Sequence, residues 1–471
     1  MFDINRRIHF VGIGGTGMSG IAEVLLNLGY RVSGSDSKDS ETVKRLRELG
    51  AEITIGHLAS SVTTADVVVA SSAINKNNPE LQEAAHKRIP VIHRSEMLAE
   101  LMRLKHGIIV AGTHGKTTTT SLLATVLSAS GIDPTVVIGG RLNALGANAK
   151  LGKSDFFLAE ADESDGSFLR LTPSIAVVTN IDRDHLDHWS GLDEIIVAFR
   201  TFLEKTPFYG CICACIDDPG VQLVVPHLRR KIITYGLRPD ADIFAKNIFQ
   251  EGFSTTFTPV FFGVEQKQVT LKMPGRHNVQ NALASYAVAS ALRLDPSLVG
   301  KAIGAFQGVQ HRTTLLGTTE NTVVIDDYAH NPQKIAAALK GLREGYRTAH
   351  LCAIFQPHRY TRVKSMLEEF ACGFADADSV IVTPIYSAGE TPIPGINPEC
   401  IAQHIRNHSF GGSAAPVFVV SDLQHATSTA VQIAKQNSNQ NPKNITVIVS
   451  LGAGDVANTG EWILKQLRGE K

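Results

Sequence analysis

A glycine turn followed by a lysine and a run of threonines lies in the segment VAGTHGKTTTTSLLATVL, residues 110–127. It follows an apolar stretch typical of a strand and precedes a helical pattern from Thr117 to about Ser130. Backbone N–H groups in such a turn can hold phosphate oxygens, Lys116 can neutralise the charge of the β- and γ-phosphates, and the Thr117 hydroxyl can ligate Mg²⁺. The turn therefore predicts ATP binding.

This turn is a shortened form of the standard P-loop, GxxxxGK[ST]. That pattern requires a glycine where this chain has Val110. The positive end of the following helix adds to the attraction for phosphate. A helix start that is merely rich in threonine would leave the lysine and the preceding strand unexplained. The predicted ATP-binding residues of the turn are Gly112, Thr113, His114, Gly115, Lys116, Thr117 and Thr118.

Two acidic clusters follow the phosphate turn. The first, DFFLAEADESDGSF, ends an apolar stretch with Glu160 and further carboxylates, and the second, TNIDRDHLDHW, does so from Asp182 onward. Carboxylates suit Mg²⁺, and strand C-termini form the edge at which α/β sites are built. Either cluster alone would more often be a solvated loop, but beside a phosphate turn they favour a Mg²⁺ site. Imidazole is a less usual Mg²⁺ ligand, so His185 could instead orient a water or a carboxylate.

A second glycine turn, GIGGTG from Gly12 to Gly17, lies near the start of the chain. It follows an apolar stretch and opens a helical pattern, and Asp36 stands at the end of the next predicted strand. Glycines let the backbone approach a diphosphate at a helix N-terminus, and the acid can accept hydrogen bonds from a ribose. The context favours a nucleotide over a tight turn without a ligand. NAD is the default candidate, although any ligand with a diphosphate and a ribose satisfies the same physics.

Further polar side chains lie near the start of the helical pattern in GRHNVQN and in the segment GVQHRTTLLG. Asn278 and Asn281 could contact an adenine edge or simply cap the helix. Arg312 could reach a γ-phosphate or stabilise a domain junction. These alternatives stay open from the residues alone.

A cluster of cationic side chains follows an apolar stretch in FQPHRYTR, residues 355–362. His358, Arg359 and Arg362 lie within five residues of one another. Guanidinium groups bind carboxylates bidentately, so this segment is a candidate carboxylate clamp. A polar loop after a strand is the alternative.

The order of strand-like and helical patterns predicts an α/β protein with mostly parallel sheets. Three domains are expected: a Rossmann-like domain over 1–106, a P-loop-type ATPase over 107–312, and a second Rossmann-like domain over 313–471. Within the central domain, the period-2 pattern between about 232 and 275 predicts a small antiparallel part. CICAC at 211–215 is interpreted as a buried strand, because no partner Cys or His pair for a metal lies nearby.

Composition excludes several classes of protein. Lys+Arg and Asp+Glu are both 45, whereas a nucleic-acid-binding protein would usually carry a basic excess. No run approaches the roughly 18 apolar residues that span a bilayer, and the start of the chain does not resemble a signal peptide. A soluble, cytoplasmic, reduced protein is expected.

Together these segments resemble the Mur ligases, the ATP-dependent amide-forming enzymes of peptidoglycan synthesis, over essentially the whole chain. GTHGKTT is shared by Mur ligases and folylpolyglutamate synthases, whereas GIGGTGMSG and QPHRYTR are similar to the members that join L-alanine to UDP-N-acetylmuramate. The resemblance implies the same ligase activity, which proceeds through an acyl phosphate with ATP and Mg²⁺ as cofactors. The chain is expected to be a cytoplasmic monomer or homodimer with no nucleic acid or membrane partner.

The resemblance further implies roles for individual residues. Mg²⁺ would be bound through Thr117, Glu160 and His185, and His330 would be the general base for the incoming ammonium. The third domain is expected to close over the cleft and exclude water from the acyl phosphate. Residues implied to act in the chemistry are Lys116, Glu160, His185, Arg312 and His330, and Asn278 and Asn281 are added to the ATP site. Residues implied to bind substrate are Gly12, Gly14, Gly15, Thr16, Gly17, Ser35, Asp36, His57, Ser72, His358, Arg359 and Arg362.

The chain departs from the alanine-adding members at two motifs. Asn331 stands where they usually have a second histidine next to the first, and His311-Arg312-Thr313 stands where they usually read RRF. Arg312 is then the one arginine of that motif left to serve the phosphate. The alternative functions are a related ligase that adds a recycled tripeptide to UDP-N-acetylmuramate, a P-loop kinase or regulatory NTPase, and an NAD-dependent oxidoreductase.

Overall fold

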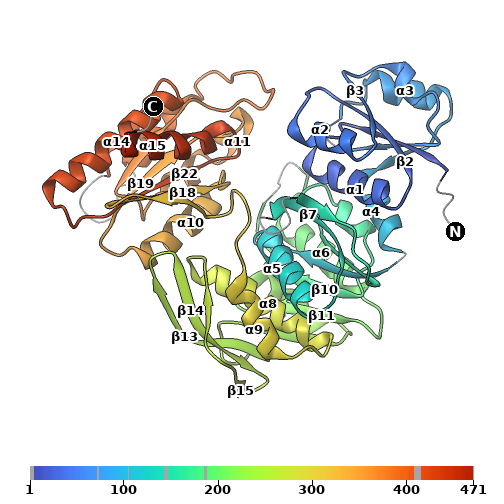
Figure 1. Cartoon of the computed structure of the whole chain (residues 1–471), viewed down its shortest axis with the longest axis horizontal. Helices are drawn as coiled ribbons and strands as arrows, with labels where there is room; N and C mark the ends of the chain where they lie inside the picture. The colour runs from blue at the N-terminus through green and yellow to red at the C-terminus, as the bar shows by residue number, and fades with distance from the viewer. Residues whose placement is uncertain are drawn as a thin grey trace. The chain divides into compact units, whose positions relative to one another are not determined.

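The computed structural model describes residues 5–71, 74–103, 105–142, 147–184, 188–407 and 415–469 (Figure 1). The chain forms two compact units. Unit 1 comprises Met1–Lys246, Thr258–Val269 and Gln280–Gln307, and unit 2 comprises Asn247–Phe257, Thr270–Val279 and Gly308–Lys471.

The first sheet of unit 1 is parallel, in the order β3-β2-β1-β4-β5. Strand order reverses at β1, and open α/β sheets bind ligands outside the carboxyl ends of the strands at such a point. Phe10 on β1 packs with α1, α2 and α4, whereas the next residue, Val11, packs with η1 and α3 on the other face. The elements are β1 (Arg7–Val11), α1 (Thr16–Asn27), β2 (Arg31–Asp36), α2 (Glu41–Glu48), β3 (Glu52–Ile55), η1 (Ala59–Val62), β4 (Val67–Ala70), α3 (Pro79–His86), β5 (Val91–His93) and α4 (Arg94–Met102).

A second, longer sheet has the order β15-β14-β13-β12-β11-β10-β6-β9-β7-β8, with β16 beside β14. Its middle strands are parallel, and antiparallel pairs include β7–β8 and β14–β15. The strands are β6 (His106–Ala111), β7 (Thr135–Leu142), β8 (Ala147–Lys150), β9 (Phe156–Glu160), β10 (Ile175–Val178), β11 (Cys211–Cys215), β12 (Ile232–Gly236), β13 (Ile243–Glu251), β14 (Ser254–Phe261), β15 (Val264–Glu265) and β16 (Val269–Leu271). This arrangement confirms the predicted α/β class with mostly parallel strands and a small antiparallel part.

The predicted start of the antiparallel part was wrong. β12 pairs in parallel with both β11 and β13, so the parallel arrangement continues past residue 232. A period-2 pattern reports that a strand is half-buried, and it carries no information on the direction of the neighbouring strand. The CICAC prediction is confirmed, because β11 is buried along its whole length and its three cysteines are free thiols.

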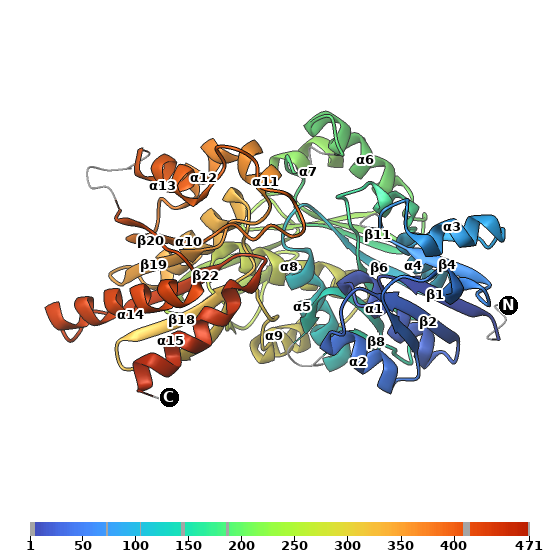
Figure 2. The same ribbon diagram turned by 90° about the horizontal axis from the view of Figure 1, so that it is seen from above.

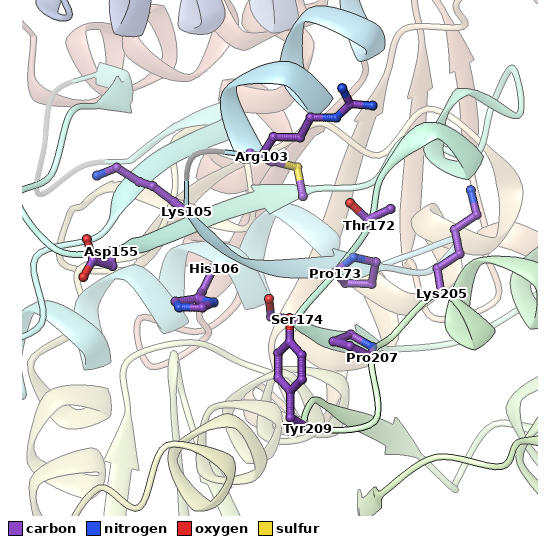
Figure 3. A pocket seen from close by; sticks show the side chains of 11 residues that line it. Arg103, Lys105, His106, Asp155, Thr172, Pro173, Ser174, Lys205, Pro207 and Tyr209 are labelled. Carbon is purple, nitrogen blue, oxygen red and sulfur yellow. The ribbon is translucent and has the colours of Figure 1, made fainter. Parts of the chain in front are cut away.

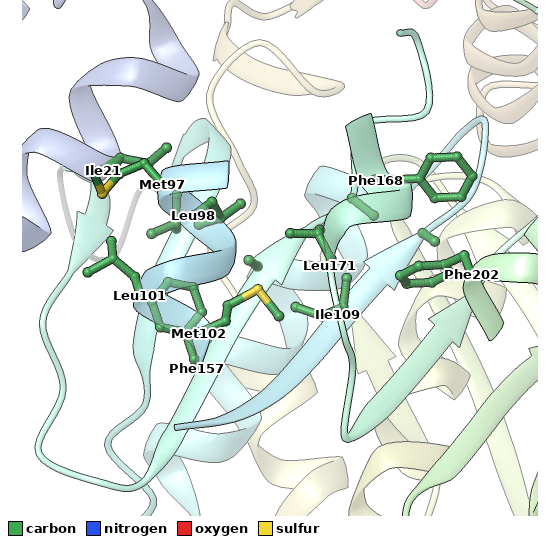
Figure 4. Close-up of a cluster of buried hydrophobic side chains, with 14 of the residues drawn as sticks. Ile21, Met97, Leu98, Leu101, Met102, Ile109, Phe157, Phe168, Leu171 and Phe202 are labelled. Atoms are coloured by element: carbon green, nitrogen blue, oxygen red, sulfur yellow. The ribbon is translucent and has the colours of Figure 1, made fainter. Parts of the chain in front are cut away.

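One continuous core joins the first sheet's helices to the second sheet (Figure 4). Ile21 of α1 and Met97 of α4 belong to the same buried cluster as Ile109 of β6, Phe157 of β9 and Phe202 of α6. The two glycine turns of unit 1 are therefore carried on one packed body. The remaining helices are α5 (Lys116–Ala129), η2 (Ser167–Arg170), α6 (Leu192–Glu204), α7 (Pro219–Val224), η3 (Val225–His227), α8 (Arg276–Ala291, which begins in unit 2) and α9 (Pro296–Ala305).

The main sheet of unit 2 has the order β17-β18-β22-β19-β20-β21. All neighbouring strands are parallel except β17, which pairs antiparallel with β18 and was not predicted. β17 is only partly buried, so its apolar pattern is weak. The strands are β17 (Thr314–Thr318), β18 (Thr322–Asp327), β19 (His350–Phe355), β20 (Ser379–Val382), β21 (Val417–Val419) and β22 (Thr446–Leu451).

Helices cover both faces of this sheet (Figure 2). α14 and α15 pack against residues such as Ile354 and Ile448, and α10, α12 and α13 pack against their strand neighbours Phe355 and Val449 on the opposite face. The helices are α10 (Pro332–Gly345), α11 (Tyr360–Ser365), α12 (Leu367–Gly373), α13 (Pro398–Asn407), α14 (Leu423–Gln440), η4 (Asp455–Ala457) and α15 (Asn458–Arg468). Among the described residues, no helix has the length and apolar character needed to cross a membrane.

Candidate active site

The phosphate turn joins β6 to α5, and its backbone leaves no room for side chains. Gly112 has a φ of +143°, and a Cβ there would lie 2.0 Å from Oγ1 of Thr179. Gly115 precedes α5 with a φ of +80°, and a Cβ there would lie 2.6 Å from Oδ1 of Asn281. α5 begins at Lys116 without a side-chain cap, so its first N–H groups are available to an anion in the turn.

Lys116 is held at the turn by a buried ion pair. Its Nζ donates to the carbonyl oxygen of Gly112 at 2.5 Å and to Oε2 of Glu163 at 2.6 Å. The two charged side chains are 17% and 4% exposed, so the lysine is enclosed with its counter-ion beside the place where a phosphate would bind. The sequence named Glu163 only as one member of an acidic cluster and did not predict this pairing.

Thr117 and Glu160 come together across α5 and β9. Oγ1 of Thr117 donates to Oε2 of Glu160 at 3.1 Å, so a hydroxyl and a carboxylate, both hard oxygen donors, fit Mg²⁺ here. His185, the third predicted ligand, lies outside the described residues. Within the described part of the chain, no group of three or more His, Cys, Asp or Glu side chains could hold a metal ion. Phosphate oxygens and water would supply further ligands of an ion at this pair.

The described start of the second acidic cluster supports the phosphate turn. The N–H of Asp182 donates to Oγ1 of Thr113 at 2.9 Å, and its carboxylate lies 3.6 Å from Nε2 of His114. The contact with His114 lowers the pKa of Asp182, against the effect of burial. Thr113 and His114 are thus positioned by the acid, which braces the turn.

Arg94, the first residue of α4, connects the first glycine turn to the first acidic cluster. Its Nη2 donates to Oδ2 of Asp162, and its Nη1 lies 2.7 Å from where a Cβ on Gly17 would stand. Burial acts to raise the pKa of Asp162, but Arg94, with Ser164 and Lys116, lowers it to about 2. A cation therefore lies next to the first glycine turn, and no role was predicted for Arg94 from the sequence.

The first glycine turn joins β1 to α1 and is anchored by Asp36. The Gly14 N–H donates to Oδ2 of Asp36 at 2.8 Å, and the Gly12 N–H donates to the Ser35 carbonyl at 2.8 Å. Gly12 has a φ of +77°, and Gly15 precedes α1 without a side-chain cap. The turn thus presents the free N–H groups of a helix start, with an acid at its side. The side chain of Thr16 lies outside the described part.

The residues predicted beside the nucleoside meet at the carboxyl edge of the first sheet. Oγ of Ser35 lies 2.9 Å from Nδ1 of His57, and both contact the carboxylate of Glu80, which is fully buried. Ser72, predicted to lie near the sugar, is outside the described residues. Glu80 was not singled out by the sequence.

Each of the two asparagines predicted at the adenine edge has a structural contact. Oδ1 of Asn281 accepts from Oγ1 of Thr119 at 3.1 Å in unit 1, which ties α8 to α5. In unit 2, Nδ2 of Asn278 donates to the Pro274 carbonyl at 2.7 Å, at the start of α8. These contacts fit the capping and packing alternative.

In unit 2, the predicted carboxylate clamp forms around two histidines. The rings of His330 and His358 are 5.9 Å apart, and His358 stacks on Tyr386 at 5.5 Å. Nη1 of Arg362 lies 3.3 Å from Nδ1 of His358. Arg359, which precedes α11, has a φ of +66°, and this strained backbone is fixed by its N–H bond to the Tyr386 carbonyl.

Both histidines are neutral near pH 7. Burial, then the charges of Lys334 and Arg362, hold the pKa of His330 well below its usual value. Burial and the neighbouring arginines lower the pKa of His358 to about 4. Nδ1 of His330 donates to the Tyr328 carbonyl at 2.8 Å, which leaves Nε2 with a lone pair that can accept a proton.

The two residues that flank Arg312 are held by the acids that end β18. Nδ1 of His311 lies 2.5 Å from Oδ2 of Asp326, and this contact raises the pKa of His311. The N–H and Oγ1 of Thr313 both donate to Oδ2 of Asp327 at 2.7 Å. The guanidinium of Arg312 lies 4.9 Å from the ring centre of Tyr328, a cation–π contact. The departure from RRF thus keeps one arginine on a fixed loop.

Comparison with known proteins identifies the family. Residues 7–106 match the Mur ligase family, catalytic domain; residues 110–289 match the Mur ligase middle domain; and residues 311–454 match the Mur ligase, glutamate ligase domain. These matches cover most of the sequence. The chain belongs to the Mur ligase family.

Several Mur ligases are similar over nearly their full length. UDP-N-acetylmuramate–L-alanine ligase of Trichlorobacter lovleyi is 48% identical over 99% of this chain and all of that protein, and the enzyme of the same name from Geobacter sp. strain M21 is 49% identical over the whole of both chains. The crystal structure of UDP-N-acetylmuramate-alanine ligase MurC from Thermotoga maritima has a TM-score of 0.81 at 28% identity, covering 99% of this chain and all of that one. The three-domain Mur ligase fold is thereby confirmed.

A separate cavity of about 500 Å³ lies at the amino ends of strands in the longer sheet of this Mur ligase (Figure 3). Its lining includes His106 and Ser174, at the amino ends of β6 and β10, whereas the phosphate turn follows the carboxyl end of β6. Lys105 donates to the Gly152 and Ser154 carbonyls, and Lys205 donates to the Leu169 carbonyl. Its lysines thus have structural partners, and the cavity is not part of the candidate active site.

Proposed function

We propose that this Mur ligase joins L-alanine to the carboxylate of UDP-N-acetylmuramate, with conversion of ATP to ADP and phosphate. The observation that carries the proposal is the pair of glycine turns on one packed body, one equipped for phosphoryl transfer and one for a second nucleotide. The full-length similarity to enzymes of that name supports the choice of substrates. Such an ATP-consuming step of peptidoglycan precursor synthesis belongs in the cytoplasm.

We assign UDP-N-acetylmuramate to the first glycine turn. The helix start of α1 would hold the diphosphate, and Asp36 would accept hydrogen bonds from the ribose. Ser35 and His57 would lie at the nucleoside, and Arg94 gives a cation next to the turn. The predicted domain over 1–106 would therefore bind the nucleotide sugar, and that over 107–312 would bind ATP.

We assign ATP to the second glycine turn, with Lys116 at its β- and γ-phosphates. Thr117 and Glu160 would hold Mg²⁺, together with His185 as the resemblance implies. The ion would supply charge neutralisation for the transferred phosphoryl group. When ATP binds, Lys116 would exchange part of its contact with Glu163 for a contact with phosphate, because the carboxylate and the phosphate compete for the same ammonium.

The chemistry follows from the poor reactivity of a carboxylate as an acyl donor. An oxygen of the muramate carboxylate attacks the γ-phosphorus, the bond to the bridging oxygen of ADP breaks, and an acyl phosphate forms. The amine of L-alanine then attacks the acyl carbon, and the C–O bond to phosphate breaks. Arg359 and Arg362 would bind the L-alanine carboxylate, His330 would accept the proton from its ammonium at Nε2, and Arg312 would serve the phosphate.

Phosphate release from ATP and Mg²⁺ tests this function. The assay contains UDP-N-acetylmuramate and, in separate reactions, L-alanine, glycine, L-serine or a tripeptide. Release that requires both the sugar nucleotide and L-alanine is the expected result, and it would make Asn331 a tolerated substitution. Release with the tripeptide instead would move the protein to the recycling branch, and no release with any acceptor would overturn the proposal.

A further inference from the structure

Three polar side chains converge in the first domain on a buried carboxylate, that of Glu80, which the proposed chemistry does not use. Glu80 is the second residue of α3, where Pro79 begins the helix and Oδ1 of Asn78 accepts the Glu80 N–H at 2.8 Å. This cap fixes the helix start and turns the Glu80 side chain into the domain, where the residue has 0% exposure. A buried carboxylate is costly unless its oxygens are satisfied, so its partners are informative.

The partners of Glu80 come from three other segments. Oγ of Ser35 donates to Oε2 at 2.6 Å, and Nδ1 of His57 lies 3.0 Å from the same oxygen. Nε2 of the buried His9 lies 3.4 Å from Oε1. Burial acts to raise the pKa of Glu80, but the contacts with His9, Ser35 and His57 hold it below its usual value, so the group is a carboxylate near pH 7.

The hydrogen positions follow from these contacts. An ionised carboxylate only accepts, and the single hydroxyl hydrogen of Ser35 is directed at Glu80. Nδ1 of His57 lies 2.9 Å from Oγ of Ser35 and 3.0 Å from Oε2 of Glu80, and neither atom has a hydrogen to offer it. Nδ1 must therefore carry the hydrogen itself. In the neutral ring, Nε2 is then left with a lone pair.

Nε2 of His57 is the nitrogen that remains for a ligand. Within the described residues, no hydrogen bond is formed at this atom, and a quarter of the His57 side chain (25%) is exposed. His57 follows the carboxyl end of β3, and the N–H of its neighbour Gly56 donates to the Asp36 carbonyl at 2.8 Å. It therefore lies at the ligand-binding edge of the sheet, beside the acid assigned to the ribose.

We propose that Glu80 is a positioning residue that fixes the Nδ1–H tautomer of His57, so that Nε2 accepts a hydrogen bond from a donor group of the nucleoside. The proposal rests on the assignment of UDP-N-acetylmuramate to this edge. In a uridine nucleotide the donors are N3–H of the base and the ribose hydroxyls. Cytosine has a lone pair at N3, so acceptance from the base would discriminate against a cytidine nucleotide.

Nitrogen-15 NMR of the histidine-labelled protein tests the tautomer without any ligand. His57, assigned from the spectrum that loses its signals in His57→Ala, is expected to show a protonated Nδ1 and a lone-pair Nε2. A wild-type ring with its hydrogen on Nε2 would overturn the proposal. This readout distinguishes positioning from packing, because a purely structural Glu80 would not select one tautomer.

Binding of UDP, CDP and 2′-deoxy-UDP to the wild type, Glu80→Met and His57→Ala tests the consequence. Removal of the carboxylate is expected to weaken the binding of UDP about 3- to 10-fold, the value of one hydrogen bond. It should also reduce discrimination against whichever analogue lacks the donor. CDP identifies the base as the donor, and 2′-deoxy-UDP identifies the ribose. Glu80→Gln keeps a carbonyl oxygen for Ser35 and His57 and should restore binding, whereas Glu83→Met, one turn along the same helix, should have no effect.

The possible failures are distinct. If Glu80→Met and His57→Ala retain the wild-type preference among the three nucleotides, Glu80 is not a positioning residue. If the wild type binds none of them nor UDP-N-acetylmuramate, the assignment of the nucleotide sugar to this edge fails. If Glu80→Met does not fold, the wild-type NMR tautomer and the His57→Ala preference still decide the proposal.

Discussion

The two glycine turns of unit 1 use the same backbone arrangement and differ in the side chains around it. Each follows a parallel strand, has a glycine with positive φ directly after that strand, and opens a helix that has no side-chain cap. The first turn has an acid bonded to its backbone, Asp36, and a cation next to it from another helix, Arg94. The second has Lys116 within the motif and a hydroxyl–carboxylate pair close by.

These side chains distinguish a turn that only binds a phosphate from a turn that can also support phosphoryl transfer. Backbone N–H groups at a helix start are sufficient to bind a diphosphate, and an acid at the side suits a ribose. Phosphoryl transfer develops charge that needs a cation and a metal ion placed at the reacting group. The second turn has the residues for both, and the first turn has no oxygen pair comparable to Thr117 and Glu160 among its described contacts.

Replacement of the lysine should have the largest effect. Lys116→Met removes the cation from the phosphate turn and takes the ion pair away from the buried Glu163, so phosphate release should fall by about 10²- to 10³-fold. Lys246→Met removes an exposed lysine paired with Glu265 and should leave the rate unchanged. A Lys116→Met enzyme that keeps more than a tenth of the wild-type rate would remove the distinction between the two turns.

Alanine substitutions at glycines should show that the two turns differ in how tightly their backbones are packed. Gly29→Ala, at a φ of +88° with open space around it, should cost only the left-handed strain of about 1–2 kcal/mol. Gly12→Ala should cost slightly more, because it also meets the flexible end of Ile74 at 3.0 Å. Gly112→Ala should cost the most, since its Cβ would overlap Thr179. Urea unfolding measures the order, and an equal loss at 112 and 29 would contradict the tight packing of the phosphate turn.

The acid of the first turn should affect one substrate only. Asp36→Ala is expected to raise the KM for UDP-N-acetylmuramate by about 10- to 100-fold, the value of hydrogen bonds to a charged group, with the KM for ATP unchanged. Initial rates at varied concentrations of each substrate measure this. Asp39→Ala, which removes an acid paired with Arg47 nearby, is the matched control. A rise in both KM values would mean that Asp36 supports the unit as a whole.

The smallest expected effect, on the pH dependence of stability, comes from a third glycine turn at Gly275. It extends the comparison because this turn packs against an imidazole. A Cβ on Gly275 would lie 2.6 Å from Cε1 of His277, and burial lowers the pKa of His277 to about 4. Between the ordinary pKa of histidine and pH 4, His277 is protonated in the unfolded chain and neutral in the folded one. The free energy of unfolding therefore falls as the pH falls through that range.

The slope from His277 alone is at most about 1.4 kcal/mol per pH unit. His277→Asn should flatten the pH dependence of urea unfolding below pH 6.5. His86→Asn, at an exposed position, should leave the slope as it is. An unchanged slope in His277→Asn would show that the imidazole is not held neutral by the turn.

Local patterns in the sequence were sufficient for the turns and not for their partners. The strand, glycine turn and helix of each motif could be predicted, because these features lie within about 20 residues. Glu163, Arg94 and Glu80 could not be, since their contacts join residues 47, 68 and 45 positions apart and depend on how the sheets pack. The parallel direction of β12 and β13 was missed for the same reason, because strand direction is set by partners distant in sequence.

The central claim is that the two turns hold two different nucleotides. The most direct test is calorimetric binding of UDP-N-acetylmuramate and of Mg²⁺ with a non-hydrolysable ATP analogue to the wild type, Asp36→Ala and Lys116→Met. The account predicts that Asp36→Ala weakens only the nucleotide sugar and that Lys116→Met weakens only the ATP analogue. Loss of both ligands in either variant, or the reverse assignment, would contradict it.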